Sequence, residues 1–243
     1  MDYSKMKIPH HVGIIIDGNG RWAEEHGKKR SYGHKAGAEN FEKLALHIFN
    51  TGVKVLSAYV FSTENFKRSD EEVHNIMELF VKKTKQLTKT YQKKNIKVLF
   101  SGRREPLSKE VLKTMDEITE MTKNNTDGIL NFCLNYGGHS EIVDATLKVF
   151  KDLKENKIIE DDVDEELFGH YLYQDLPPID FLIRTSGEYR ISNFMLWQAS
   201  YAEFYFPKTY FPDFNEEEFD KAILEYTKRD RRFGGIDYEK KNS

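Results

Sequence analysis

Residues 12–22 read Val-Gly-Ile-Ile-Ile-Asp-Gly-Asn-Gly-Arg-Trp, and this stretch decides the fold. Its apolar run predicts a buried strand, and the polar residues that follow predict an anion-binding turn. Glycines let a ligand approach backbone N–H groups, and the forked Arg21 side chain suits phosphate oxygens. Asp17 offers the carboxylate oxygen that Mg²⁺ prefers. An ordinary strand-to-helix turn is the alternative, because Gly and Asn are common turn residues.

The residues after this stretch favour the anion-binding interpretation. Arg30, His34 and Lys35 lie near the start of a helical pattern. A binding site explains so many potential phosphate ligands in one short segment better than a solvated helix face does. The sequence therefore predicts a phosphate site that begins at Asp17.

Short apolar runs alternate with helical periodicity along the chain, which predicts an α/β fold. The runs are almost continuously apolar, as in a parallel sheet covered on both faces. We predict strands at 12–16, 55–61, 96–100, 129–134, 181–184 and 202–206. We predict helices at 34–50, after residue 69, and at 108–123, 140–153, 164–173 and 216–228. Together they form an open, mostly parallel sheet flanked by helices, in a single domain (1–243) with flexible ends at 1–9 and 236–243.

Two helix starts carry a capping-box pattern, Ser69 with Glu72 and Asn215 with Glu218. In such a box the first residue caps the helix, and the acidic side chain three positions later bonds back to the cap residue. Both patterns therefore predict where a helix begins.

Polar residues stand where the predicted strands end. They are Asp17, Ser62, Asn135 and Thr185, after the first, second, fourth and fifth strands. Ligands of open α/β sheets bind beyond the carboxyl ends of the strands. We therefore expect these residues to gather at one edge of the sheet.

Composition narrows the class of protein. The chain has 243 residues, 39% hydrophobic content and a formal net charge of −3, so bulk electrostatics give no case for nucleic acid. Its one cysteine, Cys133, excludes an intrachain disulfide and is expected to be a buried thiol. The first residues do not form a signal peptide, and no apolar run is long enough to span a membrane.

Two further clusters have both a binding and a structural interpretation. Residues 61–68 follow a predicted strand and offer hydroxyls, an amide and a cation, but a loop can use such groups on its own backbone. Residues 184–192 carry two arginines that could clamp a diphosphate, or that could form surface ion pairs of little energetic worth.

Two other features have an ordinary structural explanation. Glu203 lies in an aromatic, strand-like run, where edge exposure is the default expectation because a buried charge is costly. Seven lysines between positions 82 and 97 are better explained by a solvated face than by attraction to anionic lipid.

The motifs taken together resemble the cis-prenyltransferases, in particular the bacterial undecaprenyl diphosphate synthases. The resemblance covers nearly the whole chain, from about residue 10 to 235. The matching motifs are HV at 11–12, DGNGRWA at 17–23, GHKAG at 33–37, FSTEN at 61–65, NYGG at 135–138, RTSGE at 184–188, RISNF at 190–194 and RRFGG at 231–235.

This resemblance implies a homodimer in which each chain carries a parallel six-stranded sheet and an apolar tunnel. It implies Mg²⁺-dependent, sequential condensation of isopentenyl diphosphate onto farnesyl diphosphate, with a cis double bond formed at each step. The implied product is undecaprenyl diphosphate, the precursor of the lipid carrier for cell-wall polysaccharide. It also implies a cytoplasmic protein, with peripheral contact at the inner face of the membrane as a hypothesis.

The resemblance also implies roles for individual residues. Asp17 is the catalytic Mg²⁺ ligand, Asn65 the catalytic proton acceptor, and Glu203 a second metal ligand that reaches the site across the dimer. An amide is a weak base, so a diphosphate oxygen or a relayed water is an equal candidate for the last proton. The substrate-binding residues implied are Gly18, Asn19, Gly20, Arg21, Trp22, Arg30, His34, Ser62, Thr63, Glu64, Phe66, Arg68, Arg184, Arg190, Ile191 and Ser192. The tunnel candidates are Phe41, Leu44, Ile48, Met77 and Phe80, although such a helix face is more often plain core.

The chain departs from the family pattern at three places. Phe66 stands where Trp is common, and Tyr189 stands where some members have a His that can approach the metal. The strand near Gly128 lacks a bulky residue, which leaves product length open, so a cis-prenyltransferase of another product length is one alternative. A non-catalytic partner subunit is another, and the presence of Asp17, Asn19, Arg21 and Asn65 argues against it. A phosphatase with an aspartyl nucleophile is disfavoured, because Asn19 stands where its second carboxylate is expected.

Overall fold

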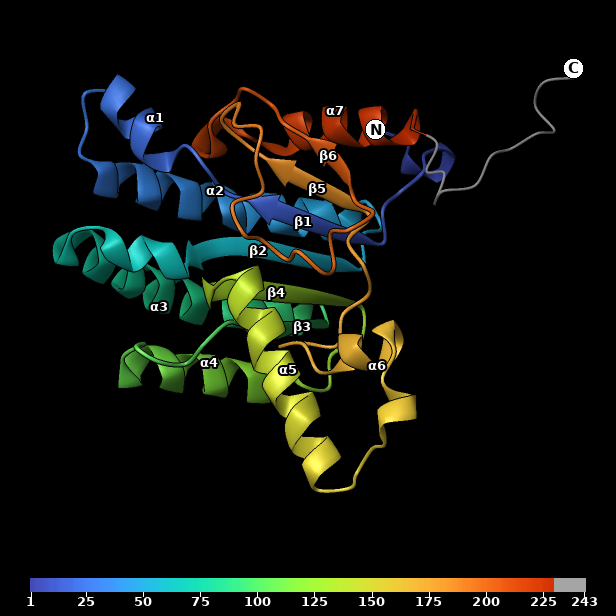
Figure 1. The fold of residues 1–243 in the computed structure, drawn as a ribbon. Helices are drawn as coiled ribbons and strands as arrows, with labels where there is room; N and C mark the ends of the chain where they lie inside the picture. The colour runs from blue at the N-terminus through green and yellow to red at the C-terminus, as the bar shows by residue number, and fades with distance from the viewer. Residues whose placement is uncertain (230–243) are drawn as a thin grey trace, which may run out of the picture.

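The structure is a computed structural model that describes residues 1–229 (Figure 1). Its six strands form one sheet in the order β3-β4-β2-β1-β5-β6, and every neighbouring pair is parallel. The strands are β1 (His11–Ile15), β2 (Val55–Ser62), β3 (Ile96–Ser101), β4 (Gly128–Tyr136), β5 (Phe181–Arg184) and β6 (Glu203–Tyr205). The α/β fold with six strands is confirmed, and the sheet is parallel throughout. The motif at 231–235 and the end at 236–243 lie outside the described residues.

Residues 1–229 also form seven α-helices, of which six lie between strands and the last follows β6. They are α1 (Asn19–Glu25), α2 (Arg30–Asn50), α3 (Asp70–Lys93), α4 (Lys109–Thr122), α5 (Gly138–Lys154), α6 (Glu165–His170) and α7 (Glu216–Thr227). Short 3₁₀ turns lie at Tyr3–Lys5, Thr63–Lys67, Glu160–Asp162 and Phe211–Asp213. None of the helices from residue 1 to 229 is long and apolar enough to cross a membrane.

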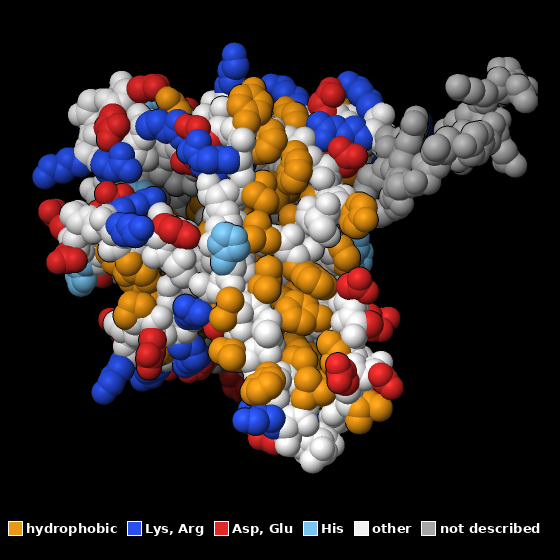
Figure 2. Space-filling model, in the orientation of Figure 1, with side chains coloured by type: hydrophobic (Ala, Val, Ile, Leu, Met, Phe, Trp, Pro, Cys, Tyr) orange, Lys and Arg blue, Asp and Glu red, His pale blue; other side chains and the backbone are white. Residues whose placement is uncertain are grey.

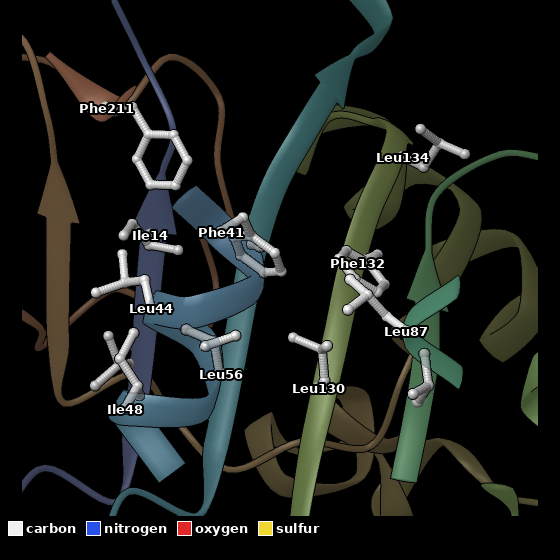
Figure 3. Packing of buried hydrophobic residues seen from close by; sticks show 14 of the residues in the cluster. Ile14, Phe41, Leu44, Ile48, Leu56, Leu87, Leu130, Phe132, Leu134 and Phe211 are labelled. Atoms are coloured by element: carbon white, nitrogen blue, oxygen red, sulfur yellow. The ribbon is translucent and has the colours of Figure 1, made fainter. Parts of the chain in front are cut away.

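Both faces of the sheet are buried, which explains the continuously apolar strands. On one face Ile14 and Leu56 pack with side chains from α2, α3, α4 and α7 in the main hydrophobic cluster. Figure 3 shows this face, with Phe41, Leu44 and Ile48 of α2 against the strands. The opposite face packs Ile15 and Leu182 with the segment that contains Phe194. Cys133 lies buried on that face, as predicted, and burial raises the pKa of its thiol.

The predicted helix starts are right, but the capping boxes are only half formed. The Ser69 and Asn215 side chains accept the N–H groups of Glu72 and Glu218, respectively. The Glu72 carboxylate bonds to Arg68 and His34. The Glu218 carboxylate bonds to Thr209 and Lys221. Both carboxylates therefore have partners elsewhere instead of the cap residue.

Helix α1 is absent from the sequence-based prediction, and its close contact with α2 explains why it forms. A Cβ atom on Gly33 would lie 1.9 Å from the Asn19 carbonyl oxygen, and one on Gly37 would lie 2.0 Å from Asn19 Oδ1. Only glycine at both positions lets Asn19 approach the α2 backbone this closely. Tertiary contact thus holds a short helix that begins with residues of low helix propensity.

A row of buried polar side chains crosses the sheet from β1 to β3. His11 Nδ1 lies 2.7 Å from the Pro177 carbonyl oxygen, and its Nε2 lies 2.8 Å from Ser57 Oγ. Asn131 donates to Ser57 and accepts from the Ser101 hydroxyl. Since a carbonyl only accepts, His11 donates from Nδ1, and a neutral imidazole can accept the Ser57 hydroxyl proton at Nε2.

This row predicts a loss of stability in acid. Burial lowers the pKa of His11 to about 4, against the opposing effects of the Pro177 carbonyl and the Asp180 charge. The unfolded chain binds the proton near pH 6.5, so the folded chain loses stability as the pH falls from 6.5 to about 4. The loss attributable to His11 is about 3 kcal/mol. Urea unfolding of wild type and His11→Asn across this range should show a flatter pH dependence for the variant.

The control for this measurement is His74→Gln, because His74 lies on the exposed face of α3. It should retain the wild-type slope. Parallel slopes for wild type and His11→Asn would contradict the prediction.

Candidate functional site

Three segments meet beyond the carboxyl ends of β1, β2 and β5. The strand register sets Ile15 level with both Tyr59 and Arg184, so the residues that follow these strands converge. They surround a cavity of about 400 Å³. Its polar rim is formed by Asp17, Gly18, Asn19, Gly20, Arg21, Arg30, His34, Ser62, Asn65, Arg68, Arg184 and Ser192. Its interior is lined by apolar residues that include Phe41, Ile76, Leu79, Phe80, Leu87 and Phe132.

Asp17 is held between two arginines at the centre of this rim. Its Oδ2 accepts a hydrogen bond from Arg184 (2.8 Å), and its Oδ1 accepts one from the Gly18 N–H (2.7 Å) and lies 3.3 Å from Arg21. Burial raises the pKa of the Asp17 carboxyl, but Arg184, Gly18 and Arg21 lower it more, and the net shift is downward. Asp17 is therefore a carboxylate at neutral pH.

The Asp17 carboxylate fits a magnesium ion only as one ligand among several. A carboxylate offers about four acceptor positions, and the contacts above use three of them. From residue 1 to 229 no group of three or more His, Cys, Asp or Glu side chains could hold a metal. Mg²⁺ commonly binds one protein carboxylate and completes its shell with substrate phosphates and water. The donor set is consistent with that mode.

Two arginines and a histidine gather around Glu72 in the first turn of α3. Its Oε1 lies 3.0 Å from Arg68 and 3.3 Å from His34, and its Oε2 lies 3.4 Å from Arg30. Burial raises the pKa of the Glu72 carboxyl, but Arg30, His34 and Arg68 lower it more. Arg30 also bonds to Glu24 (2.9 Å). Glu72 thus pairs with Arg30 and Arg68, two of the residues that were predicted to hold a diphosphate.

Replacing Glu72 by Gln should strengthen the binding of inorganic pyrophosphate. The amide keeps the shape of the side chain but no longer competes as an anion for Arg30 and Arg68. We expect a fall in Kd of about threefold to tenfold, since one charge contact at this exposure is worth about 1 kcal/mol. Isothermal titration calorimetry at fixed ionic strength measures the change. Glu71→Gln, one position earlier and exposed, is the matched control. Weaker binding by Glu72→Gln than by this control would contradict the prediction.

The loop after β5 forms the other side of the rim. Arg184 is buried, and it donates to the Arg190 carbonyl oxygen (2.8 Å) and to Ser192 Oγ (2.6 Å) as well as to Asp17. Glu188 bridges Arg21 and Arg190, at 2.6 Å from each. Ser192 has a φ of 48°, a conformation that costs energy outside glycine. Arg184 therefore ties the whole loop to the end of β1.

The turn after β2 contributes only part of its predicted residues to the cavity. Ser62 and Asn65 line it, and Asn65 Oδ1 accepts the Ser62 N–H at 3.1 Å. Glu64 accepts hydrogen bonds from Thr63 and Asn193, outside the cavity lining. Phe66 packs edge-on against Phe61, with ring centroids 4.9 Å apart.

Four other predicted residues do not line the cavity, and one of them, Arg190, is exposed and pairs with Glu188. Trp22 donates its indole N–H to Asp213 (2.7 Å) and stacks with Tyr32. Ile191 packs in the cluster on the opposite face of the sheet. Glu203 is level with Phe181 at the start of β5, so within one chain it lies toward the opposite end of the sheet from Asp17. Its carboxylate pairs with Arg229 at 3.1 Å.

The candidates for the apolar interior divide in the same way. Phe41 and Phe80 line the cavity, and Figure 3 shows Phe41 between α2 and the neighbouring strands. Leu44 and Ile48 are core, and Met77 lines a separate small cavity with Phe66. The space beside Gly128 is occupied by Phe49, whose ring would lie 2.9 Å from a Cβ there. Asn135 holds the loop after β3 through the carbonyl groups of Arg103 and Glu105.

Comparisons with known proteins agree on one family. A family model described as "Putative undecaprenyl diphosphate synthase" matches residues 15–234. The chain is 47% identical to an isoprenyl transferase of Fusobacterium nucleatum, over 94% of this chain and 97% of the relative. It is 46% identical to an isoprenyl transferase of Thermotoga maritima, over 95% and 99%.

Two solved structures share the fold. Lavandulyl diphosphate synthase from Lavandula x intermedia, in complex with dimethylallyl diphosphate, matches with a TM-score of 0.88 and 32% identity, over 93% of this chain and 98% of that one. A probable undecaprenyl diphosphate synthase from Campylobacter jejuni matches with a TM-score of 0.78 and 29% identity, over 94% and 100%.

Proposed function

Because the chain belongs to the undecaprenyl diphosphate synthase family of prenyltransferases, we propose that it condenses isopentenyl diphosphate stepwise onto farnesyl diphosphate. Each step forms a cis double bond, and the product is undecaprenyl diphosphate, the precursor of the lipid carrier for cell-wall polysaccharide. The observation that carries the proposal is the cavity with a cationic rim and an apolar interior. Such a cavity suits a ligand with a diphosphate head and a hydrocarbon chain.

The allylic diphosphate is proposed to bind at the turn after β1. Backbone N–H groups of residues 18–21 and the side chains of Asn19, Arg21 and Arg30 would hold its oxygens, and His34 and Arg68 would complete the group. When the allylic carbon–oxygen bond breaks, both bonding electrons leave with the diphosphate. The arginines stabilise the negative charge that then develops on the diphosphate, which lowers the activation free energy of this step. Mg²⁺ bound at Asp17 would supply Lewis-acid neutralisation of the same oxygens.

Isopentenyl diphosphate is proposed to bind beside it, on Arg184, Arg190 and Ser192. Its double bond attacks the allylic carbon, and a proton is then lost to form the new cis double bond. We propose a diphosphate oxygen as the final proton acceptor, because an amide is a weak base, and Asn65 Oδ1 accepts the Ser62 N–H. Asn65 would then orient the substrate. The prenyl chain would lie between α2 and α3, where Phe41 and Phe80 face the cavity.

We also propose a homodimer, located in the cytoplasm. Figure 2 shows a band of apolar side chains over α5, α6 and the segments around β5 and β6. The exposed residues in these elements include Val143, Leu147, Phe150, Trp197, Tyr201 and Phe204. A second copy would cover such a surface. The partner subunit's Glu203 would then be the second metal ligand, in line with the position of Glu203 far from Asp17 in its own chain. An unpaired buried thiol at Cys133 suits a reducing compartment.

The test is incubation with radiolabelled isopentenyl diphosphate, farnesyl diphosphate and Mg²⁺, followed by chromatographic sizing of the extracted lipid. A ladder that ends at the undecaprenyl length supports the proposal. A ladder that ends elsewhere supports a cis-prenyltransferase of another product length. No incorporation by folded protein would exclude the enzyme and favour a non-catalytic partner subunit.

A further inference from the structure

Charge is segregated along the chain around the end of α3. Residues 79–104 contain no Asp or Glu, although the chain as a whole has a net charge of −3. The cations of this stretch are Lys82, Lys83, Lys85, Lys89, Lys93, Lys94, Lys97, Arg103 and Arg104. Such a block of one sign is typical of a surface that meets a partner of opposite charge.

Four of these lysines form one row on α3. Lys82, Lys85, Lys89 and Lys93 fall within an arc of about 80° at 100° per residue, and the row is about 17 Å long. All four are exposed, and they lie opposite the buried side of the helix at Leu87. We call these four residues the lysine row.

The charge of the lysine row is largely unbalanced by neighbouring carboxylates. Lys85 lies 4.0 Å from Glu110, at the limit of an ion pair, whereas the other three form no ion pair with any residue from 1 to 229. The nearby arginines differ, since Arg103 and Arg104 each lie 2.8 Å from an aspartate. The row therefore keeps the ammonium groups of Lys82, Lys89 and Lys93 without an ion pair among the described residues, and that of Lys85 only weakly paired.

The position of α3 favours a lipid surface over nucleic acid. The inner side of the helix, at Ile76, Phe80 and Leu87, lines the apolar cavity of the candidate site. Lys82 and Lys85 line a second cavity of about 870 Å³, which shares Ile76 and Leu79 with the first. The row carries no exposed aromatic side chain on which a base could stack, because Tyr91 is buried. Helix α3 thus lines the cavity on one side, mostly with apolar side chains but also with Lys83 and Thr84, and carries the lysine row on the other.

We propose that the lysine row of α3 docks the protein on the surface of a bilayer that contains anionic phospholipid. The ammonium groups would contact lipid phosphates, and α3 would lie along the membrane surface with its cavity side turned inward. The contact is electrostatic and reversible, and it does not require that the chain elongate prenyl diphosphates.

Co-sedimentation with vesicles of phosphatidylglycerol and phosphatidylcholine tests this, beside vesicles of phosphatidylcholine alone. The full chain should bind only the anionic vesicles and should be released by about 1 M salt, where screening extends only about 3 Å. Each lysine at an anionic surface is worth roughly a fivefold change in partitioning at low salt. The quadruple variant Lys82→Gln, Lys85→Gln, Lys89→Gln and Lys93→Gln should therefore bind at least about 100-fold more weakly.

A matched variant separates the row from net charge. Lys113→Gln, Lys123→Gln, Lys221→Gln and Lys228→Gln remove the same charge from lysines that have carboxylate partners. This variant should bind the anionic vesicles within about threefold of wild type, because these four lysines are already paired with carboxylates and lie outside the lysine row. Circular dichroism confirms that both variants are folded. Equal losses in the two variants, equal binding to both kinds of vesicle, or tighter binding to a DNA duplex than to vesicles would each overturn the proposal. Because no turnover is measured, the result is independent of the proposed enzyme activity.

Discussion

Replacing Asp17 by Asn should lower kcat by about 1000-fold, a loss of about 4 kcal/mol of transition-state stabilisation. Asn keeps the size of the side chain but removes its charge. The buried Arg184 then loses its anionic partner at 2.8 Å, and Arg21 loses the contact at 3.3 Å. The proposed metal site also loses its carboxylate. One substitution thus removes a ligand and disorders the cations on both sides of it.

Initial rates of radiolabelled isopentenyl diphosphate incorporation, at saturating substrate and a series of Mg²⁺ concentrations, measure this effect. Asp116→Asn is the matched control, because Asp116 pairs with Arg104 on the surface and should leave kcat unchanged. Thermal unfolding shows whether each variant is folded. A folded Asp17→Asn protein with kcat within tenfold of wild type would exclude the proposed role of Asp17.

Replacing Arg184 by Lys should lower kcat/KM for isopentenyl diphosphate by about 100-fold to 1000-fold. The guanidinium bonds at once to Asp17, to the Arg190 carbonyl oxygen and to Ser192. A single ammonium cannot reproduce this planar arrangement of donors, although it keeps the positive charge. We expect the loop at 186–192 to loosen and the second diphosphate to bind poorly.

Two comparisons make the result for Arg184 specific. Arg190→Lys changes a more exposed guanidinium and should raise KM with a smaller effect on kcat, because Arg190 does not contact Asp17. Arg104→Lys is the control for the surface and should be without effect. Wild-type kcat/KM in a folded Arg184→Lys protein would show that this arrangement of donors is not needed.

Sequence alone predicted most of the fold because the sheet is buried on both faces. A strand such as 12–16 has no polar side chain on either face, so its apolar run stands out without any structural information. The missing helix, α1, has the opposite character. Gly and Asn at its start have low helix propensity, and only the contact of Asn19 with α2 shows that a helix forms. Such long-range contacts leave no local pattern.

The rim of the site was predicted only in part, because parallel-sheet topology places some of its residues and not others. Asp17 follows β1 and Arg184 is the last residue of the neighbouring parallel strand β5, so the sheet topology alone brings them together. Glu72 was missed because its spacing from Ser69 also fits a capping box, and the sequence cannot show that its carboxylate turns to Arg30. Trp22 stands next to Arg21 in the chain, but the turn of α1 directs it to Asp213. Neighbouring residues on a helix point in different directions, so adjacency in sequence does not show that both line the same cavity.

The close contact of Asn19 with Gly33 and Gly37 links the turn at 17–20 mechanically to α2. Asn19 of this turn packs on the 21-residue helix through its backbone at Gly33 and through its side chain at Gly37, with no α2 side chain between them, so the turn and the helix are in direct contact. One turn after Gly37, Phe41 of the same helix lines the apolar part of the cavity. A prenyl chain that displaced α2 outward would therefore also displace the turn at 17–20 and change how that turn binds an anion. The apolar end of the cavity and its anion-binding end would thus be coupled through α2 alone.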